Sequence, residues 1–189
     1  GHLGRMNTAL LDKLLHGHTD SDAELVDEWL AQQYGGPQPA EAVEILLGAD
    51  DLVSEGIYWD RGIPNRQPFA SLHTTKLYWM FDGFADPAFP YRMAGITRET
   101  VERIIATKHG AYEKAAAAVE RIAAARAAMH PQLFEELTSA TTMLRDAILL
   151  CRDWHSYVLI QYAIERGVYP PERPVLGRMS RYAETFVRN

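Results

Sequence analysis

The feature that most constrains the fold is a helical pattern that runs from Thr97 to about Arg166 and is broken once, at His130-Pro131. On both sides of the break, apolar residues recur three or four positions apart, which is the spacing of one buried helix face. A residue before proline is disfavoured in the helical region, so His130 ends the first helix. Two helices of about 30 residues with a tight junction predict an antiparallel hairpin. The predicted stripes comprise Val101, Ile104, Ile105, Tyr112, Val119 and Ile122, then Leu137, Leu144, Ile148, Cys151, His155, Val158 and Tyr162.

Shorter helical patterns precede and follow this hairpin, over residues 4–15, 21–34, 39–57 and 174–188. Ser21 and Glu24 form a capping box at the start of the second pattern, and Gly35-Gly36 can end it. Gly48 interrupts the third pattern and indicates a bend or a close helix crossing there. No stretch alternates like a strand, so we expect one all-α domain over residues 1–189, a helical bundle with two long antiparallel helices.

The composition narrows the class of partner. The net charge is −6 and the sequence pI about 5.6, which argues against binding a nucleic-acid backbone. The single cysteine excludes an intrachain disulfide, so a cytoplasmic protein is expected, with a secreted one as the alternative. No apolar run reaches the roughly 20 residues of a membrane span, so no membrane association is expected. Gly1-His2 resembles a tag remnant, so residues 1–3 are expected to be such a remnant or disordered.

Residues 60–96 depart from the helical pattern because four prolines and three glycines punctuate them. A structureless loop of this length is unusual in a compact domain, so we expect an ordered, aromatic-rich excursion between helices. Its aromatic side chains can stack on a sugar ring, and its charged side chains can bind hydroxyls or a carboxylate. The same aromatics can instead anchor the loop by burial, which is the favoured interpretation. The candidate ligand-binding residues are Trp59, Asp60, Arg61, His73, Trp79 and Asp82.

Elsewhere the residues favour structural roles over chemistry. The chain contains no Glu-x-x-His pair for a di-metal bundle, no glycine-rich phosphate loop and no Gly-x-Ser-x-Gly. His155 and Cys151 lie on the apolar stripe, where a hydrogen-bonded core histidine and an inert buried thiol are expected. Arg152 and Asp153 are expected to face solvent or a partner. No catalytic residue, metal site or cofactor is therefore predicted.

One resemblance to a known family bears on these expectations. The stretch "DAELVDEWLAQQYGGPQPAEAVEILLGADDLVSEGIYW" and the later "YEKAAAAVERIAAARAAM" resemble the all-helical C-terminal region of barrel glycoside hydrolases of the family 67 α-glucuronidase type. The likeness covers about Asp20 to Arg166, with Glu28-Trp29 and Tyr34-Gly35 at its start. In such enzymes this region packs beside the barrel and contributes to dimer contacts. The barrel carries the catalytic carboxylates, so the resemblance assigns no catalytic residue to this chain.

Three functional hypotheses follow. The first is a non-catalytic helical module, related to the C-terminal domain of a glycoside hydrolase, that packs on a catalytic barrel domain or associates with itself. The second is a helical protein that binds a small molecule or carbohydrate under residues 54–84. The third is a metal-dependent enzyme built on a helical bundle.

Overall fold

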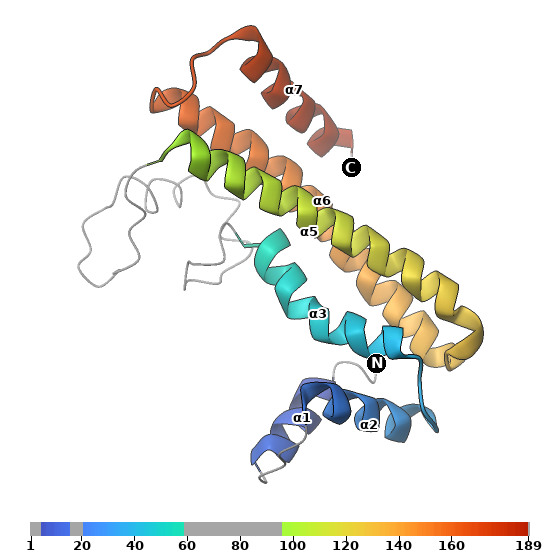
Figure 1. The fold of residues 1–189 in the computed structure, drawn as a ribbon. Coiled ribbons are helices and arrows are strands. Elements are labelled where there is room, and N and C mark those ends of the chain that lie inside the picture. Colours follow the sequence, from blue (N-terminus) through green and yellow to red (C-terminus); the bar gives the residue numbers. More distant parts are fainter. Residues whose placement is uncertain (1–4, 16–20, 59–95, 189) are drawn as a thin grey trace. The chain divides into compact units, whose positions relative to one another are not determined.

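The computed structural model describes residues 5–15, 21–58 and 96–188, and every regular element among them is a helix (Figure 1). This confirms the all-α class. The helices are α1 (Met6–Leu15), α2 (Asp22–Tyr34), α3 (Ala40–Gly56), α5 (Arg98–Ala125), α6 (Pro131–Glu165) and α7 (Arg173–Arg188), with a single 3₁₀ turn, η4 (Arg126–Ala128), after α5.

The helix ends lie where capping chemistry places them. The Ser21 side chain accepts a hydrogen bond from the Glu24 amide, and the Glu24 carboxylate bonds back to Ser21, so the capping box is confirmed. Gly35 ends α2 with φ of 77°, a left-handed conformation that costs glycine little. Thr97 accepts a hydrogen bond from the Thr100 amide at 3.1 Å and so caps α5. Gly167, with φ of 71°, follows the end of α6.

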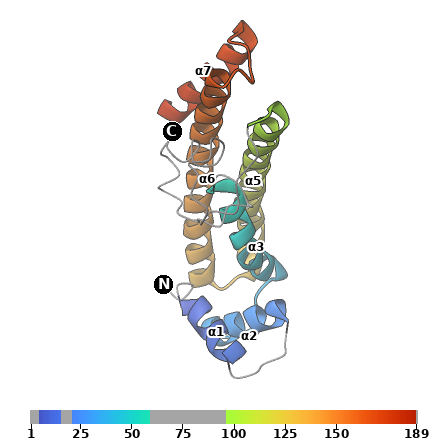
Figure 2. The same ribbon diagram turned by 90° about the vertical axis from the view of Figure 1, so that its left-hand side faces the viewer.

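The chain divides into two compact units, the first formed by residues 1–51 and 114–145 and the second by residues 52–113 and 146–189. Helices α5 and α6 contribute to both. In each unit these two helices run antiparallel, as the hairpin pattern predicts (Figure 2). They are 28 and 35 residues long. Met129 is extended, with φ of −101° and ψ of 143°, and Pro131 begins α6, so the chain reverses next to the proline.

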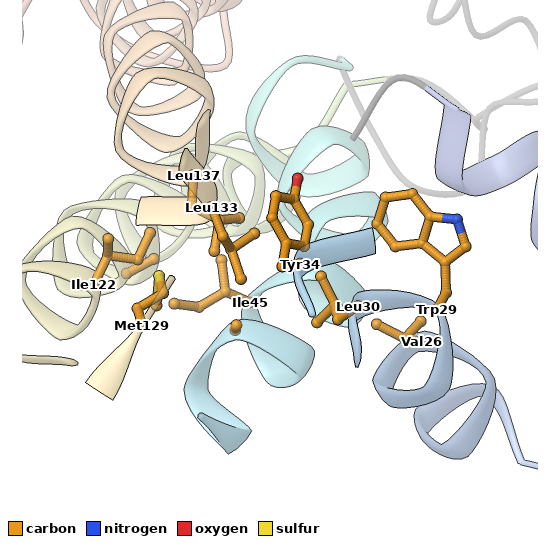
Figure 3. Close-up of a cluster of buried hydrophobic side chains, with 11 residues drawn as sticks. Val26, Trp29, Leu30, Tyr34, Ile45, Ile122, Met129, Leu133 and Leu137 are labelled. Carbon is orange, nitrogen blue, oxygen red and sulfur yellow. The ribbon is translucent and has the colours of Figure 1, made fainter. Parts of the chain in front are cut away.

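In the first unit, α2, the start of α3 and the hairpin end of α5 and α6 share one apolar core (Figure 3). Trp29 and Tyr34 meet edge to face with their ring centroids 6.4 Å apart, a favourable aromatic geometry. The predicted inward positions Leu25, Trp29 and Leu30 are all buried. The core comprises Val26, Trp29, Leu30, Tyr34, Ala42, Ile45, Ala118, Ile122, Met129, Leu133 and Leu137.

In the second unit, the first half of α5 packs against the second half of α6. Helix α7 adds Val175, Met179 and Tyr182 to this core as partly buried side chains. The core residues are Val101, Ile104, Ile105, Val158, Leu159, Ile160, Tyr162, Ala163 and Tyr169.

Gly48 was expected to mark a bend or a close helix crossing. A close approach occurs instead at Gly56, the last residue of α3. A Cβ atom on Gly48 would meet no atom within 4 Å, whereas one on Gly56 would lie 2.5 Å from Cγ1 of Ile148. Ile148 is fully buried on α6. Gly56 is therefore the position at which a missing side chain lets two helices approach closely.

Candidate functional site: polar groups of helices α5, α6 and α7

The ligand-binding residues predicted from the sequence, Trp59, Asp60, Arg61, His73, Trp79 and Asp82, lie outside the described residues, as does the excursion over residues 60–96 apart from Ile96. The hypothesis of a site under this segment therefore stays a prediction.

If the segment binds a carbohydrate by stacking, Trp59→Ala or Trp79→Ala should weaken binding by about 1–3 kcal/mol, the size of a stacking contact on a flat ring. The melting temperature without ligand should stay near that of the wild type. Calorimetric titration with a sugar panel, beside thermal unfolding, measures both quantities. If both variants only melt earlier and no sugar shifts the melting temperature, the tryptophans are structural anchors.

Within the described residues, charged and aromatic side chains gather where α5, α6 and the segment leading into α7 meet in the second unit. Glu102 on α5 binds Arg178 on α7 through two parallel hydrogen bonds of 2.9 Å, and Tyr169 also donates to Glu102. The Arg178 bonds hold the pKa of the Glu102 carboxyl below its usual range, and burial raises the pKa of Tyr169 to about 12. Arg98 lies over the Tyr169 ring, 4.8 Å from its centroid. This group fastens α7 to α5.

A second group lies further along the same helices. Nε2 of His109 on α5 is hydrogen-bonded to the Tyr182 hydroxyl on α7 at 2.8 Å. On α6, Arg152 binds one carboxylate oxygen of Asp153 through Nε at 2.8 Å and Nη2 at 2.7 Å. The Arg152 guanidinium also lies over the Tyr112 ring, 4.6 Å from its centroid. These contacts join α6 to α5, and α5 to α7.

The expectation that Arg152 and Asp153 face solvent or a partner is wrong, because both are covered within the chain. Asp153 has an exposed fraction of 0% and the Arg152 side chain one of 15%. Burial raises the pKa of the Asp153 carboxyl, and the bond from Arg152 opposes that rise. The sequence does contain a signal for this burial, a second apolar stripe on α6 formed by Leu149, Ile160 and Ala163. A helix that is apolar on more than one face is covered on more than one side.

Lys108 on α5 was not singled out from the sequence, yet it is 1% exposed. Its ammonium donates to the backbone carbonyls of Glu55 at 2.9 Å, Gly56 at 3.4 Å and Tyr58. Carbonyls at the end of a helix have no partner within it, and a cation there also interacts favourably with the helix dipole. Lys108 thus caps the end of α3. The sequence could have indicated this burial, because Lys108 lies on the same helix face as the buried Ile104 and Ile105.

Cys151 and His155 are both buried on α6, as the stripe predicts. Burial raises the pKa of the Cys151 thiol to about 11, so the nucleophilic thiolate is scarce at neutral pH. The thiol therefore has the character of an inert core residue.

His109 gives the second unit a pH dependence that can be measured. Burial, together with the charges of Arg152 and Arg178, lowers the pKa of the imidazole, while Asp153 and Glu113 act in the opposite direction. The unfolded chain therefore binds more protons than the folded one, and stability should fall as pH falls from about 6.5 through the lowered pKa.

Urea unfolding between pH 7.5 and 5 compares the wild type with His109→Gln. The other histidines are common to both proteins, so the difference between the two curves isolates His109. We expect a shallower pH dependence in the variant. Two parallel curves would contradict this role of His109.

Paired charges and hydrogen bonds at this site hold helices α5, α6 and α7 together. Among the residues that the structure covers, no three His, Cys, Asp or Glu side chains gather in a group able to hold a metal ion. No helix of the described segments is both long and apolar enough to cross a membrane. Comparison of the chain with protein-family models, curated proteins and solved structures finds no match.

Proposed function

We propose that the chain is a non-catalytic helical module that works by packing on another protein, either a catalytic domain or a second copy of itself. This proposal rests on the polar side chains of the second unit, which are bonded to other groups of the same chain. Glu102, His109 and Asp153 are each bonded to a partner that joins helices or neutralises a buried charge. Lys108 likewise has a structural role, since its ammonium donates to a carbonyl at the end of α3. A general acid or base needs a proton-accepting atom within reach of a substrate. The contacts of Glu102 and of His109 Nε2 occupy such atoms, and Asp153 is fully buried.

The kind of partner comes from the resemblance of the chain to the helical C-terminal region of family 67-type glycoside hydrolases. A region of this kind packs beside a catalytic barrel, so we propose a barrel hydrolase, or a dimer of such modules, as the partner. The contacts that join α5, α6 and α7 suit a scaffold, because a preformed surface loses little entropy on binding.

A glycosidase assay tests the non-catalytic part of this proposal. The purified chain is incubated with a panel of aryl glycosides, including glucuronides, beside Asp60→Ala, Asp82→Ala and Asp153→Asn. We expect no turnover above the buffer blank for any of the proteins. Turnover by the wild type that one of these substitutions abolishes would replace the module by an enzyme, with that carboxylate as its acid or base.

Elemental analysis of the same preparation tests the metal-dependent alternative. Less than one metal ion per ten chains would speak against a resident metal, whereas a stoichiometric ion would require that alternative to be preferred.

A further inference from the structure

Asp153 and Ser156 are polar side chains of α6 that lie in the interior of the second unit. Asp153 and Ser156 both have an exposed fraction of 0%. They are three residues apart on one helix, so they lie on the same face, one turn from each other. The stretch of α6 around them is covered on several sides, since Cys151, His155 and residues 158–160 are buried as well.

Among the described residues, each of these two side chains has one oxygen atom without a hydrogen-bond partner. Oδ1 of Asp153 accepts a hydrogen bond of 2.8 Å from Nε of Arg152 and lies 2.7 Å from Nη2 of the same guanidinium. No group in the described part of the chain makes a hydrogen bond to Oδ2 of Asp153 or to Oγ of Ser156. Buried carboxylate and hydroxyl oxygens are almost always hydrogen-bonded in folded proteins, because leaving one unmade costs its full desolvation. We therefore expect one further group to form hydrogen bonds with both oxygens.

The surrounding charges restrict what that partner can be. Asp153 is neutralised by Arg152, and Glu102 is neutralised by Arg178. The environment of His109 favours its neutral imidazole. A cation would face the positive charges of Arg152 and, near Cys151, of Lys108, whereas an anion would contact the Asp153 carboxylate itself. Either ion would also lose its hydration. The partner must be neutral, small, and able both to donate and to accept hydrogen bonds.

We propose that Asp153 and Ser156 bind an internal water molecule, which donates to Oδ2 of Asp153 and is hydrogen-bonded to Oγ of Ser156. The spacing fits one water. Side chains three apart on a helix have Cβ atoms about 5–6 Å apart, so their terminal oxygens can both reach one water at a hydrogen-bond distance of about 2.8 Å. Buried waters usually have two to four polar partners, and this site supplies two. The proposal is independent of the proposed packing function.

A high-resolution crystal structure of the wild-type protein tests the site directly. The expected result is a water peak within 3.2 Å of both oxygens. The proposal is overturned if no water is found and Ser156 instead donates to the carbonyl of Arg152, four residues earlier, as serines in helices can do. A protein donor seated on Oδ2 would overturn it equally.

Ser156→Ala supplies a test in solution, with Ser139→Ala, at an exposed position of the same helix, as the matched control. Removing one of the two water partners should lower the folding equilibrium constant about tenfold for Ser156→Ala, whereas Ser139→Ala should change it less than threefold. In the wild type, the Ser156 amide proton should also show a water cross-peak in rotating-frame NMR spectra, and Ser156→Val should remove the corresponding signal. A wild-type spectrum without this cross-peak, together with equal stabilities of the two alanine variants, would contradict the proposal.

Discussion

Replacing Arg152 with methionine is expected to destabilise the protein by about 3–5 kcal/mol at neutral pH, the effect of leaving one partner of a buried ion pair without the other. Methionine keeps much of the length and packing of the arginine stem, so the loss reports the charge more than the cavity. Asp153 is fully buried, and two nitrogens of the Arg152 guanidinium contact its Oδ1. Without Arg152, the carboxylate loses its neutralising charge.

The pH dependence distinguishes this explanation from a general packing defect. Burial already raises the pKa of Asp153, and removing Arg152 should raise it further. A raised carboxyl pKa means that the folded state binds more protons than the unfolded one, so the penalty is full at neutral pH and declines as pH falls through the folded pKa. Urea unfolding at pH 7 and pH 5 should therefore show a smaller difference between variant and wild type at pH 5. An equal loss at both values would point to packing.

The surface pair of Arg121 and Glu44 provides the control. Both side chains are about half exposed or more. Arg121→Met should change the free energy of unfolding by no more than about 1 kcal/mol, because exposed ion pairs contribute little. If Arg152→Met is as mild as Arg121→Met, Asp153 is not held as a buried charge.

Gly56→Ala is expected to destabilise the protein by about 1–3 kcal/mol, the usual cost of forcing an extra carbon into a packed core. The new Cβ would lie 2.5, 2.8 and 2.9 Å from three side-chain carbons of Ile148, which is itself fully buried. Gly48→Ala, in the same helix, should instead stabilise the protein by about 0.5–1 kcal/mol, because its Cβ meets nothing and alanine favours the helix. Urea unfolding of both variants should thus give changes of opposite sign.

A double variant shows whether Ile148 is the cause. Ile148→Ala alone should cost about 2–5 kcal/mol through the cavity it leaves. In its presence, Gly56→Ala should cost less than in the wild type, because the three clashing carbons are gone. Additive effects would mean that the glycine is needed for another reason.

The helices and most of their ends were predictable because their signals are local, although α5 ends at Ala125, before the predicted end at His130. The capping box of Ser21 and Glu24, the proline at the start of α6 and Gly167 after its end each act within a few residues of the backbone they shape. The stripe of Val101, Ile104 and Ile105 likewise reports a single buried face, and all three residues lie in a core.

The polar contacts were not predictable in the same way because they depend on which helices meet. Asp153 is buried where α6 is covered on a second side, and Lys108 reaches carbonyls 50 or more positions away in sequence. Gly56, rather than Gly48, lies at the close approach because Ile148 is opposite it. The spacing of residues along one helix indicates which face is buried. It does not specify which other helix covers that face or which charged groups form pairs there.

Sedimentation velocity shows whether the chain works by packing on another protein. The purified chain is run alone over a wide concentration range and mixed with a family 67-type barrel hydrolase that lacks its helical region. We expect either a concentration-dependent dimer or a complex of chain and barrel. A chain that sediments as a monomer at every concentration and leaves the barrel's sedimentation unchanged would contradict this expectation.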